Sequence, residues 1–272
     1  MKFSATVTLD LDTPFSWFSP GDWKKGLDWM RDSRLDGAEL CICNYNGIDV
    51  YEIKEELDRR GLGCSTLSTG AARTREGISL TGYGYEACRG AQKRLCEHID
   101  AAAVLGSKVT IGLLRGLGAA ATVEKDLRML REAMLPVAEY AQKKGVVVVL
   151  EAINRYETAL LNSAEATLDF IKNMLGDPDS VGVLWDLFHA NIEDDDFCRT
   201  ADLLGTKLKH VHIADSNRHF PGFGHTDLDN IFCKLKSSGF QEYASFECLS
   251  LPTPETALGS TAEWVGHIRA LR

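Results

Sequence analysis

Short apolar runs and amphipathic helical stretches alternate eight times along this chain. The apolar runs are typical of strands, as in Val146–Leu150, a continuous β-branched run that indicates a strand buried on both faces. Strands joined by crossover helices pair in parallel, and eight such units are what a (β/α)8 barrel, or TIM barrel, requires. The expected strands are Phe3–Leu9, Ala38–Cys43, Leu62–Leu67, Lys108–Leu113, Val146–Leu150, Val181–Trp185, Leu208–Ala214 and Tyr243–Phe246.

One domain spanning residues 1–272 is expected. The length suits a single barrel, and no Gly/Ser-rich or Pro-rich tract marks a linker. A doubly wound open sheet is the alternative, but no Gly-x-Gly-x-x-Gly turn follows the first strand. The stretch from Ser68 to Tyr83 is expected to be a long loop, and long loops are often functional. Helices are expected at 22–34, 49–60, 85–105, 122–144, 163–175, 196–205, 228–237 and 256–270.

Composition limits the classes of partner. A net charge of −9 and a pI near 5.3 disfavour nucleic acid and anionic membranes. The eight cysteines form no Cys-x-x-Cys pair, and the N-terminus does not have the pattern of a signal peptide. We therefore expect free thiols and a cytoplasmic location. No apolar run approaches the length of a membrane span.

Four candidate metal ligands stand at equivalent places in the last four strands. Glu151, Asp186 and Glu247 directly follow apolar runs, and His212 lies within the seventh strand. Their spacings are 186 − 151 = 35, 212 − 186 = 26 and 247 − 212 = 35 residues, about one βα unit each. In a barrel these side chains would ring the carboxyl-terminal mouth, where barrel enzymes keep their active sites. A structural salt-bridge cluster is the alternative.

Three carboxylates and one imidazole make a hard, oxygen-rich ligand set. Such a set suits one divalent ion in near-octahedral geometry, with Mn²⁺ as first choice and Mg²⁺ or Co²⁺ as alternatives. Structural zinc would need cysteine or more histidine.

Polar residues close to these ligands are candidate substrate contacts. Glu157 lies 6 residues after Glu151, His189 lies 3 after Asp186, and Arg218 lies 6 after His212. Each could reach a sugar hydroxyl or carbonyl oxygen, or could instead be a solvated residue or support a metal ligand.

The chain resembles ketose 3-epimerases of the xylose isomerase-like barrel superfamily, the group of D-tagatose and D-psicose 3-epimerases. The match is strongest after residue 145 and extends through Pro221-Gly-x-Gly224-His and Phe246-Glu-Cys-Leu. The main runs that carry it are Glu151-Ala-Ile-Asn-Arg-Tyr-Glu157, Trp185-Asp-Leu-Phe-His189-Ala-Asn-Ile-Glu193 and His210-Val-His-Ile-Ala-Asp-Ser-Asn-Arg218.

The resemblance implies a reaction. Residues matching the four candidate ligands bind one divalent metal, and the two glutamates are also catalytic. One of Glu151 and Glu247 removes the proton next to the ketone, and the other returns it from the far side through a metal-stabilised enediolate. Residues matching Glu157, His189 and Arg218 hold oxygens near the reacting carbons. His212, rather than His210, matches the ligand.

The sequence does not distinguish a free ketose from a keto-sugar acid as the substrate. Ser68-Thr-Gly70, Gly77-Ile-Ser-Leu-Thr81 and Ile111-Gly-Leu-Leu-Arg-Gly116 resemble a branch that epimerises keto-sugar acids such as 5-keto-L-gluconate. Arg115, and with it Arg73, could pair with a carboxylate or phosphate; both could equally be surface arginines.

The expected partner is a small sugar or keto-sugar acid, and the resemblance implies a homodimer or homotetramer. Alternatives are an aldose–ketose or hydroxypyruvate isomerase with the same ligands, and an inactive barrel that binds a partner. A phosphodiesterase of the endonuclease IV type would need several zinc ions and more histidines than the seven present.

Overall fold

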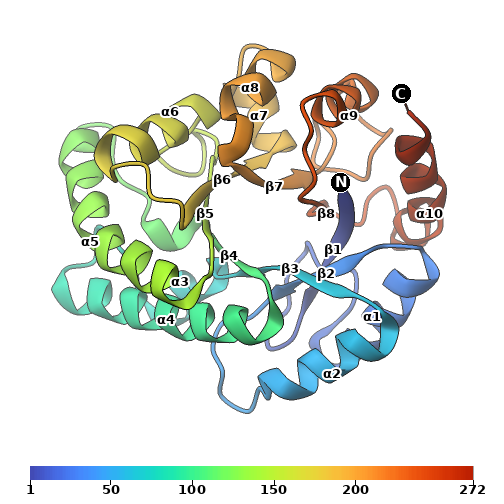
Figure 1. The fold of residues 1–272 in the computed structure, drawn as a ribbon, viewed down its shortest axis with the longest axis horizontal. Coiled ribbons are helices and arrows are strands. Elements are labelled where there is room, and N and C mark those ends of the chain that lie inside the picture. The colour runs from blue at the N-terminus through green and yellow to red at the C-terminus, as the bar shows by residue number, and fades with distance from the viewer. Residues whose placement is uncertain (272) are drawn as a thin grey trace.

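Eight parallel strands close into a barrel in chain order, with β8 pairing back to β1 (Figure 1). The computed structural model describes residues 1–271. The barrel expected from the alternation of strands and helices is confirmed. Its strands are β1 (Lys2–Thr8), β2 (Gly37–Cys41), β3 (Gly63–Ser68), β4 (Lys108–Ile111), β5 (Val148–Glu151), β6 (Val181–Asp186), β7 (Leu208–Ile213) and β8 (Tyr243–Phe246).

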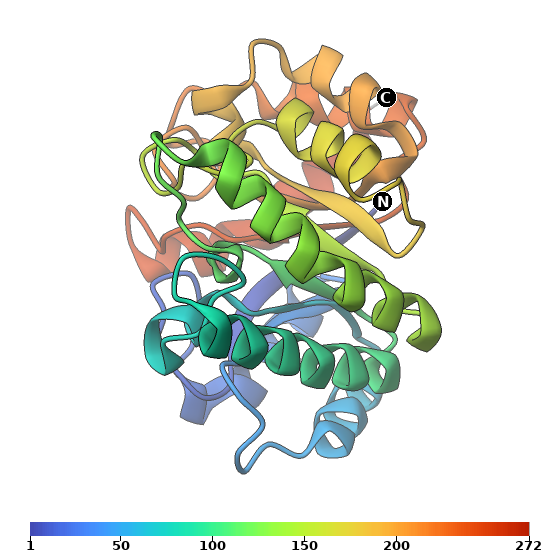
Figure 2. The same cartoon turned by 90° about the vertical axis from the view of Figure 1, so that its left-hand side faces the viewer.

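Helices surround the barrel, and most lie within a few residues of their expected bounds. In Figure 2, α4 and α5 lie side by side along one flank. The helices are α1 (Trp23–Asp32), α2 (Val50–Arg60), α3 (Gly70–Glu76), α4 (Tyr85–Leu105), α5 (Val123–Lys144), α6 (Ala164–Asp169), α7 (Leu187–Glu193), α8 (Phe197–Leu204), α9 (Leu228–Ser237) and α10 (Pro254–Ala270), with 3-10 turns at Pro20–Asp22, Leu113–Arg115 and Gly205–Lys207 and a π-helical continuation of α6 at Phe170–Met174.

Two short helices are absent from the sequence-based expectation. The stretch from Ser68 to Tyr83 is not a loop throughout, because α3 occupies Gly70–Glu76. Glu76 holds the end of α3 in place, because its carboxylate accepts hydrogen bonds from Arg94 of α4 at 2.8 and 2.9 Å. The second helix, α7, starts directly after β6. Both have only seven residues, too few for a clear hydrophobic period.

Local signals explain where the regular helices begin and end. In α2, Asp49 accepts hydrogen bonds from the Tyr51 and Glu52 amides, which otherwise lack partners at a helix start. Gly61 ends the same helix with φ +68, a left-handed conformation that glycine adopts readily. The apolar face of each helix then packs on the strands, as Leu27 and Met30 of α1 do.

Polar side chains also occupy the inside of the barrel. Ser4 Oγ of β1 donates to Ser65 Oγ of β3 at 3.0 Å, and Thr66 and Thr110 share a hydrogen bond of 2.8 Å. These buried hydroxyls hydrogen-bond to one another, so their burial costs little free energy. The barrel therefore holds a polar interior that leads to its carboxyl-terminal mouth.

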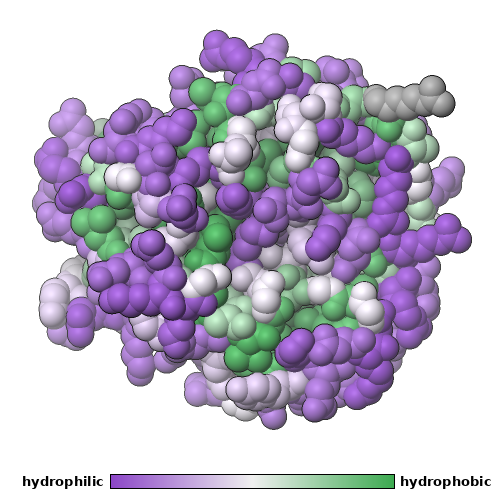
Figure 3. Space-filling model, in the orientation of Figure 1, coloured by the Kyte–Doolittle hydropathy of each residue, from purple (hydrophilic) through white to green (hydrophobic). Residues whose placement is uncertain are grey.

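The outer surface is mainly polar. On the face drawn in Figure 3, apolar residues show in smaller groups between polar ones. Within residues 1–271, no helix combines the length and apolar character needed to cross a membrane.

Candidate active site

The four predicted metal ligands converge at the carboxyl ends of β5 to β8. His212 Nδ1 lies 3.5 Å from Glu151 Oε1, 3.5 Å from Asp186 Oδ2 and 3.3 Å from Glu247 Oε2. Parallel register produces this arrangement, since Asp186 pairs with His212 in the β6–β7 ladder. One donor atom from each of the four residues lies within 4.8 Å of the others, so the group could hold a metal ion.

Asp186 divides its two oxygens between helix and site. Oδ1 accepts hydrogen bonds from the main-chain amides of Phe188 at 2.8 Å and His189 at 3.1 Å, and so caps α7. This cap fixes the side-chain rotamer and turns Oδ2 toward His212. The missed helix α7 is therefore part of what aims the carboxylate.

Three buried atoms of the cluster have no hydrogen-bond partner among residues 1–271. They are Asp186 Oδ2, His212 Nδ1 and Glu247 Oε2, and all three face the same small space. Leaving buried polar atoms unpaired away from water is costly, and a divalent cation between them would satisfy all three. The oxygen-rich donor set fits Mn²⁺, Mg²⁺ or Co²⁺, so the residues present suit the expected ion.

Burial and mutual charge shift the titration of these groups. Burial raises the pKa of the Glu247 carboxyl, although the nearby His212 opposes the rise. Burial would also raise the pKa of Asp186, but the neighbouring His189, His212 and Arg218 side chains outweigh it and hold that pKa below its usual range. Burial would lower the pKa of His212, yet the carboxylates, with Glu247 first, raise it well above its usual range.

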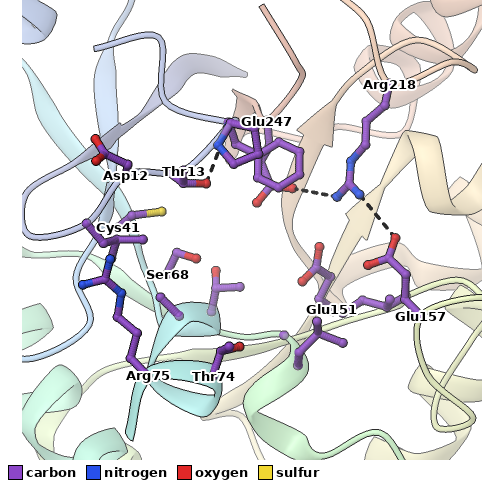
Figure 4. Close-up of a pocket in the computed structure, with 18 of the residues that line it drawn as sticks. Asp12, Thr13, Cys41, Ser68, Thr74, Arg75, Glu151, Glu157, Arg218 and Glu247 are labelled. Atoms are coloured by element: carbon purple, nitrogen blue, oxygen red, sulfur yellow. Dashed lines mark hydrogen bonds and ion pairs between the residues drawn. The ribbon is translucent and has the colours of Figure 1, made fainter. Parts of the chain in front are cut away.

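Arg218 is held rigidly over the site. Its guanidinium lies over the rings of Phe15 and Phe188, 4.4 and 4.8 Å from the two centroids. Nη1 lies 3.3 Å from Glu157 Oε1, and Nη2 lies 3.6 Å from Glu247 Oε2 (Figure 4). Two cation–π contacts and two carboxylate contacts leave this arginine few other positions.

The loop that presents Arg218 is organised by Asp215. Its carboxylate accepts hydrogen bonds from the amides of Ser216 at 2.7 Å, Gly222 at 2.8 Å and Thr226 at 3.1 Å. A Cβ on Gly224 would overlap Asp215 Oδ1, so only glycine fits there. The polar and glycine-rich run after β7 is therefore a scaffold for the arginine.

His189 and Glu157 also lie beside the ligands. Asn154 Nδ2 lies 2.7 Å from His189 Nδ1, and an amide nitrogen can only donate. The neutral imidazole of His189 then carries its proton on Nε2, which lies 3.9 Å from Glu151 Oε1. This N–H can reach an oxygen bound next to Glu151.

A cavity of about 440 Å³ opens above these groups. Glu151, Glu157, Arg218 and Glu247 lie on one side of it, and Arg75 lies on the other (Figure 4). The sequence interpretation missed several lining residues from the first half of the chain. These are Asp12, Thr13, Phe15, Cys41, Ser68, Thr74, Arg75 and Thr110. Cys41 and Ser68, the last residues of β2 and β3, were the available signal.

Arg115 does not lie where it was expected. It is fully buried, so it is neither a surface arginine nor one of the residues that line the cavity in the described chain. Its Nη1 donates to the main-chain carbonyl of Glu151, and burial lowers the pKa of the guanidinium to about 10. The structure places Arg115 behind a candidate ligand. Arg73 also lies outside the lining and donates to Tyr83 Oη at 2.6 Å.

Comparisons with known proteins agree with the resemblance seen in the sequence. L-ribulose 3-epimerase of Mesorhizobium japonicum is 30% identical over 243 residues, covering 88% of this chain and 77% of that protein. D-psicose 3-epimerase of Enterocloster bolteae is 31% identical, covering 85% and 77%. The solved D-psicose 3-epimerase of Clostridium cellulolyticum with D-tagatose superposes with a TM-score of 0.82 at 21% identity, over 100% of this chain and 99% of that one. Residues 27–267 match the family described as xylose isomerase-like TIM barrel. The chain therefore belongs to the xylose isomerase-like TIM barrel family.

Proposed function

We propose that this protein is a divalent-metal-dependent epimerase that inverts the carbon next to a ketone in a small ketose or keto-sugar acid. The observation that carries the proposal is the convergence of Glu151, Asp186, His212 and Glu247 at the barrel mouth, with unpaired acceptor atoms facing one point. The named relatives, which are sugar epimerases, support the same reaction class.

Glu151 and Glu247 are the proposed acid–base pair. Inversion requires that the proton leave one face of the carbon and return to the other, which needs two groups. These carboxylates reach the cavity from β5 and β8, which are separated by two strands. One acts as base while the other, protonated, acts as acid, and the roles exchange in the reverse direction.

The other polar residues bind and orient the substrate. The Nε2–H of His189 and the guanidinium of Arg218 point donors at oxygens near the reacting carbon, and Glu157 accepts from a hydroxyl. Both donors also compensate negative charge that develops as the proton leaves. His189 is buried and Arg218 is largely so, and their interactions are therefore stronger than at the surface.

Asp186 and His212, with the two glutamates, are the proposed ligands of one ion. Mn²⁺ is our first choice, with Mg²⁺ or Co²⁺ as alternatives. When bound, the ion would supply Lewis-acid stabilisation of the charge on the substrate carbonyl. We also propose that the protein assembles as a homodimer or homotetramer and that it acts in the cytoplasm.

The test is proton NMR in D2O with protein that has been stripped of metal and reloaded with Mn²⁺, followed by removal of the ion before spectra are recorded. Ketohexoses, ketopentoses and keto-sugar acids serve as substrates. We expect deuterium at the carbon next to the ketone, together with the epimer and without migration of the carbonyl. Carbonyl migration would identify an aldose–ketose isomerase instead. No metal-dependent exchange on any of these sugars would refute the epimerase.

A further inference from the structure

A buried glutamate on the opposite wall of the barrel contacts the proposed ligand His212 from behind. Glu39 lies in β2 and is fully buried. Its Oε1 and Oε2 each lie 3.2 Å from His212 Nε2, and Oε2 lies 3.1 Å from His210 Nε2. The strands β2 and β7 are not neighbours in the barrel, so this side chain crosses the interior to reach both histidines.

The contact determines which nitrogen of His212 faces the metal position. A carboxylate can only accept, so His212 donates an N–H from Nε2 to Glu39. In the neutral ring the lone pair then lies on Nδ1. Nδ1 is the atom that faces the carboxylates of Glu151, Asp186 and Glu247. The ring is therefore presented with the nitrogen that a metal needs.

His210 keeps the carboxylate in place. A buried carboxylate with a single donor would be poorly compensated, and His210 supplies a second N–H to Oε2. The two rings stand edge to face, with centroids 5.3 Å apart and planes at 87°, and each places its Nε2 within hydrogen-bond distance of Glu39. His210 is thus the outer member of the arrangement and does not touch the ligand cluster at Glu151, Asp186 and Glu247.

Glu39, His210 and His212 could themselves surround a second ion, since their donor atoms also lie close together. That ion would require His212 to give up its Nε2 proton as well and to bridge two metals as an imidazolate. Their distances of 3.1 and 3.2 Å are those of ordinary hydrogen bonds, which need no such step. Hydrogen bonding is the simpler assignment.

We propose that Glu39, steadied by His210, is a positioning residue that sets the tautomer and orientation of His212 for the catalytic metal. The inference rests on the proposed metal site and adds a residue of the first half of the barrel to it. Groups that hold the outer nitrogen of a metal-bound histidine raise its basicity, and their loss commonly reduces metal affinity about 10- to 100-fold.

The test uses Glu39→Gln in the full chain, with Co²⁺ as the probe. Glutamine has nearly the same volume but carries no charge, and its NH2 group replaces one of the two carboxylate oxygens that lie 3.2 Å from His212 Nε2. We expect the Kd for Co²⁺, measured by calorimetry, to rise about 10- to 100-fold and the Co²⁺ absorption bands to change. The matched control is Ser65→Ala, a buried polar change in β3 whose hydroxyl contacts Ser4 and the Ala38 carbonyl, not His212.

Unchanged Co²⁺ affinity and absorption in a folded Glu39→Gln variant would overturn the inference, and so would an equal loss in Ser65→Ala. If Glu39→Gln does not fold, ¹⁵N NMR of the wild type loaded with Zn²⁺ would show which nitrogen of His212 binds the metal. We expect His212 to be metal-bound through Nδ1 with a slowly exchanging proton on Nε2, whereas coordination through Nε2 would overturn the inference. Wild type that binds no metal would count against the proposed function itself.

Discussion

Gly112, the residue directly after β4, leaves the room that the Glu151 carboxylate occupies. A Cβ built at Gly112 would lie 2.6 Å from Glu151 Oε2 and 3.7 Å from Ile153 Cδ1. Carbon and oxygen rarely approach closer than about 3.3 Å, so Gly112→Ala would displace this oxygen by at least ~0.7 Å. The variant therefore moves a proposed ligand and base without altering its chemistry.

The consequences for stability and for activity should differ. The displaced atom is the end of a flexible side chain, so an off-rotamer cost of about 1 kcal/mol is expected, or about 2–4 °C in Tm. A misplacement of about 1 Å at a reacting group can reduce the rate about 100-fold, equivalent to about 2.7 kcal/mol. We expect kcat/KM to fall by about this factor and Co²⁺ affinity to fall about tenfold.

Calorimetric Co²⁺ binding, thermal unfolding and the epimerisation assay should be measured on the same preparations. Gly266→Ala is the matched control, because a Cβ added to this exposed glycine of α10 would meet no atom within 4 Å. Helix propensity predicts a slight gain in its stability, with metal binding and activity unchanged. Wild-type metal affinity and turnover in Gly112→Ala would refute the reasoning that Glu151 must occupy this position.

Glu247→Gln should abolish proton exchange at the carbon next to the ketone, as NMR in D2O would detect; exchange at the wild-type rate would remove Glu247 from the acid–base pair. Arg218→Lys should lower kcat/KM about 10- to 100-fold with Co²⁺ affinity nearly unchanged, because an ammonium cannot contact the Phe15 and Phe188 rings as a planar guanidinium does. An unaltered kcat/KM would contradict the role of Arg218 in orienting the substrate. Burial lowers the pKa of His98 to about 4, so the unfolded chain binds this proton more tightly. The free energy of unfolding should therefore fall by up to about 3 kcal/mol as the pH drops from about 6.5 to 4, with no contribution from His98 above that window. Urea unfolding at pH 5 and 7 checks this, and an unchanged pH slope in His98→Gln would contradict it.

The sequence by itself determined the barrel and the candidate ligands, for a physical reason. Strands buried on both faces are continuous apolar runs, so a charge at the end of each of several such runs stands out, as at Glu151 and Asp186. Because parallel strands end on the same side of a barrel, their regular spacing was enough to predict that they meet. The residues in and around these strand ends also carried the resemblance to ketose 3-epimerases.

Only the tertiary structure decided which side chains support the site from elsewhere. Glu39 sits within an apolar strand 173 residues before His212, and no local pattern connects the two. Arg115 was expected to face the substrate, yet the turn after β4 directs it into the interior beneath Glu151. The spacing of apolar residues in the sequence indicates which face of a helix or strand is buried. It does not indicate the hydrogen-bond partner of a buried polar side chain, because that depends on which distant strands the closed barrel brings together.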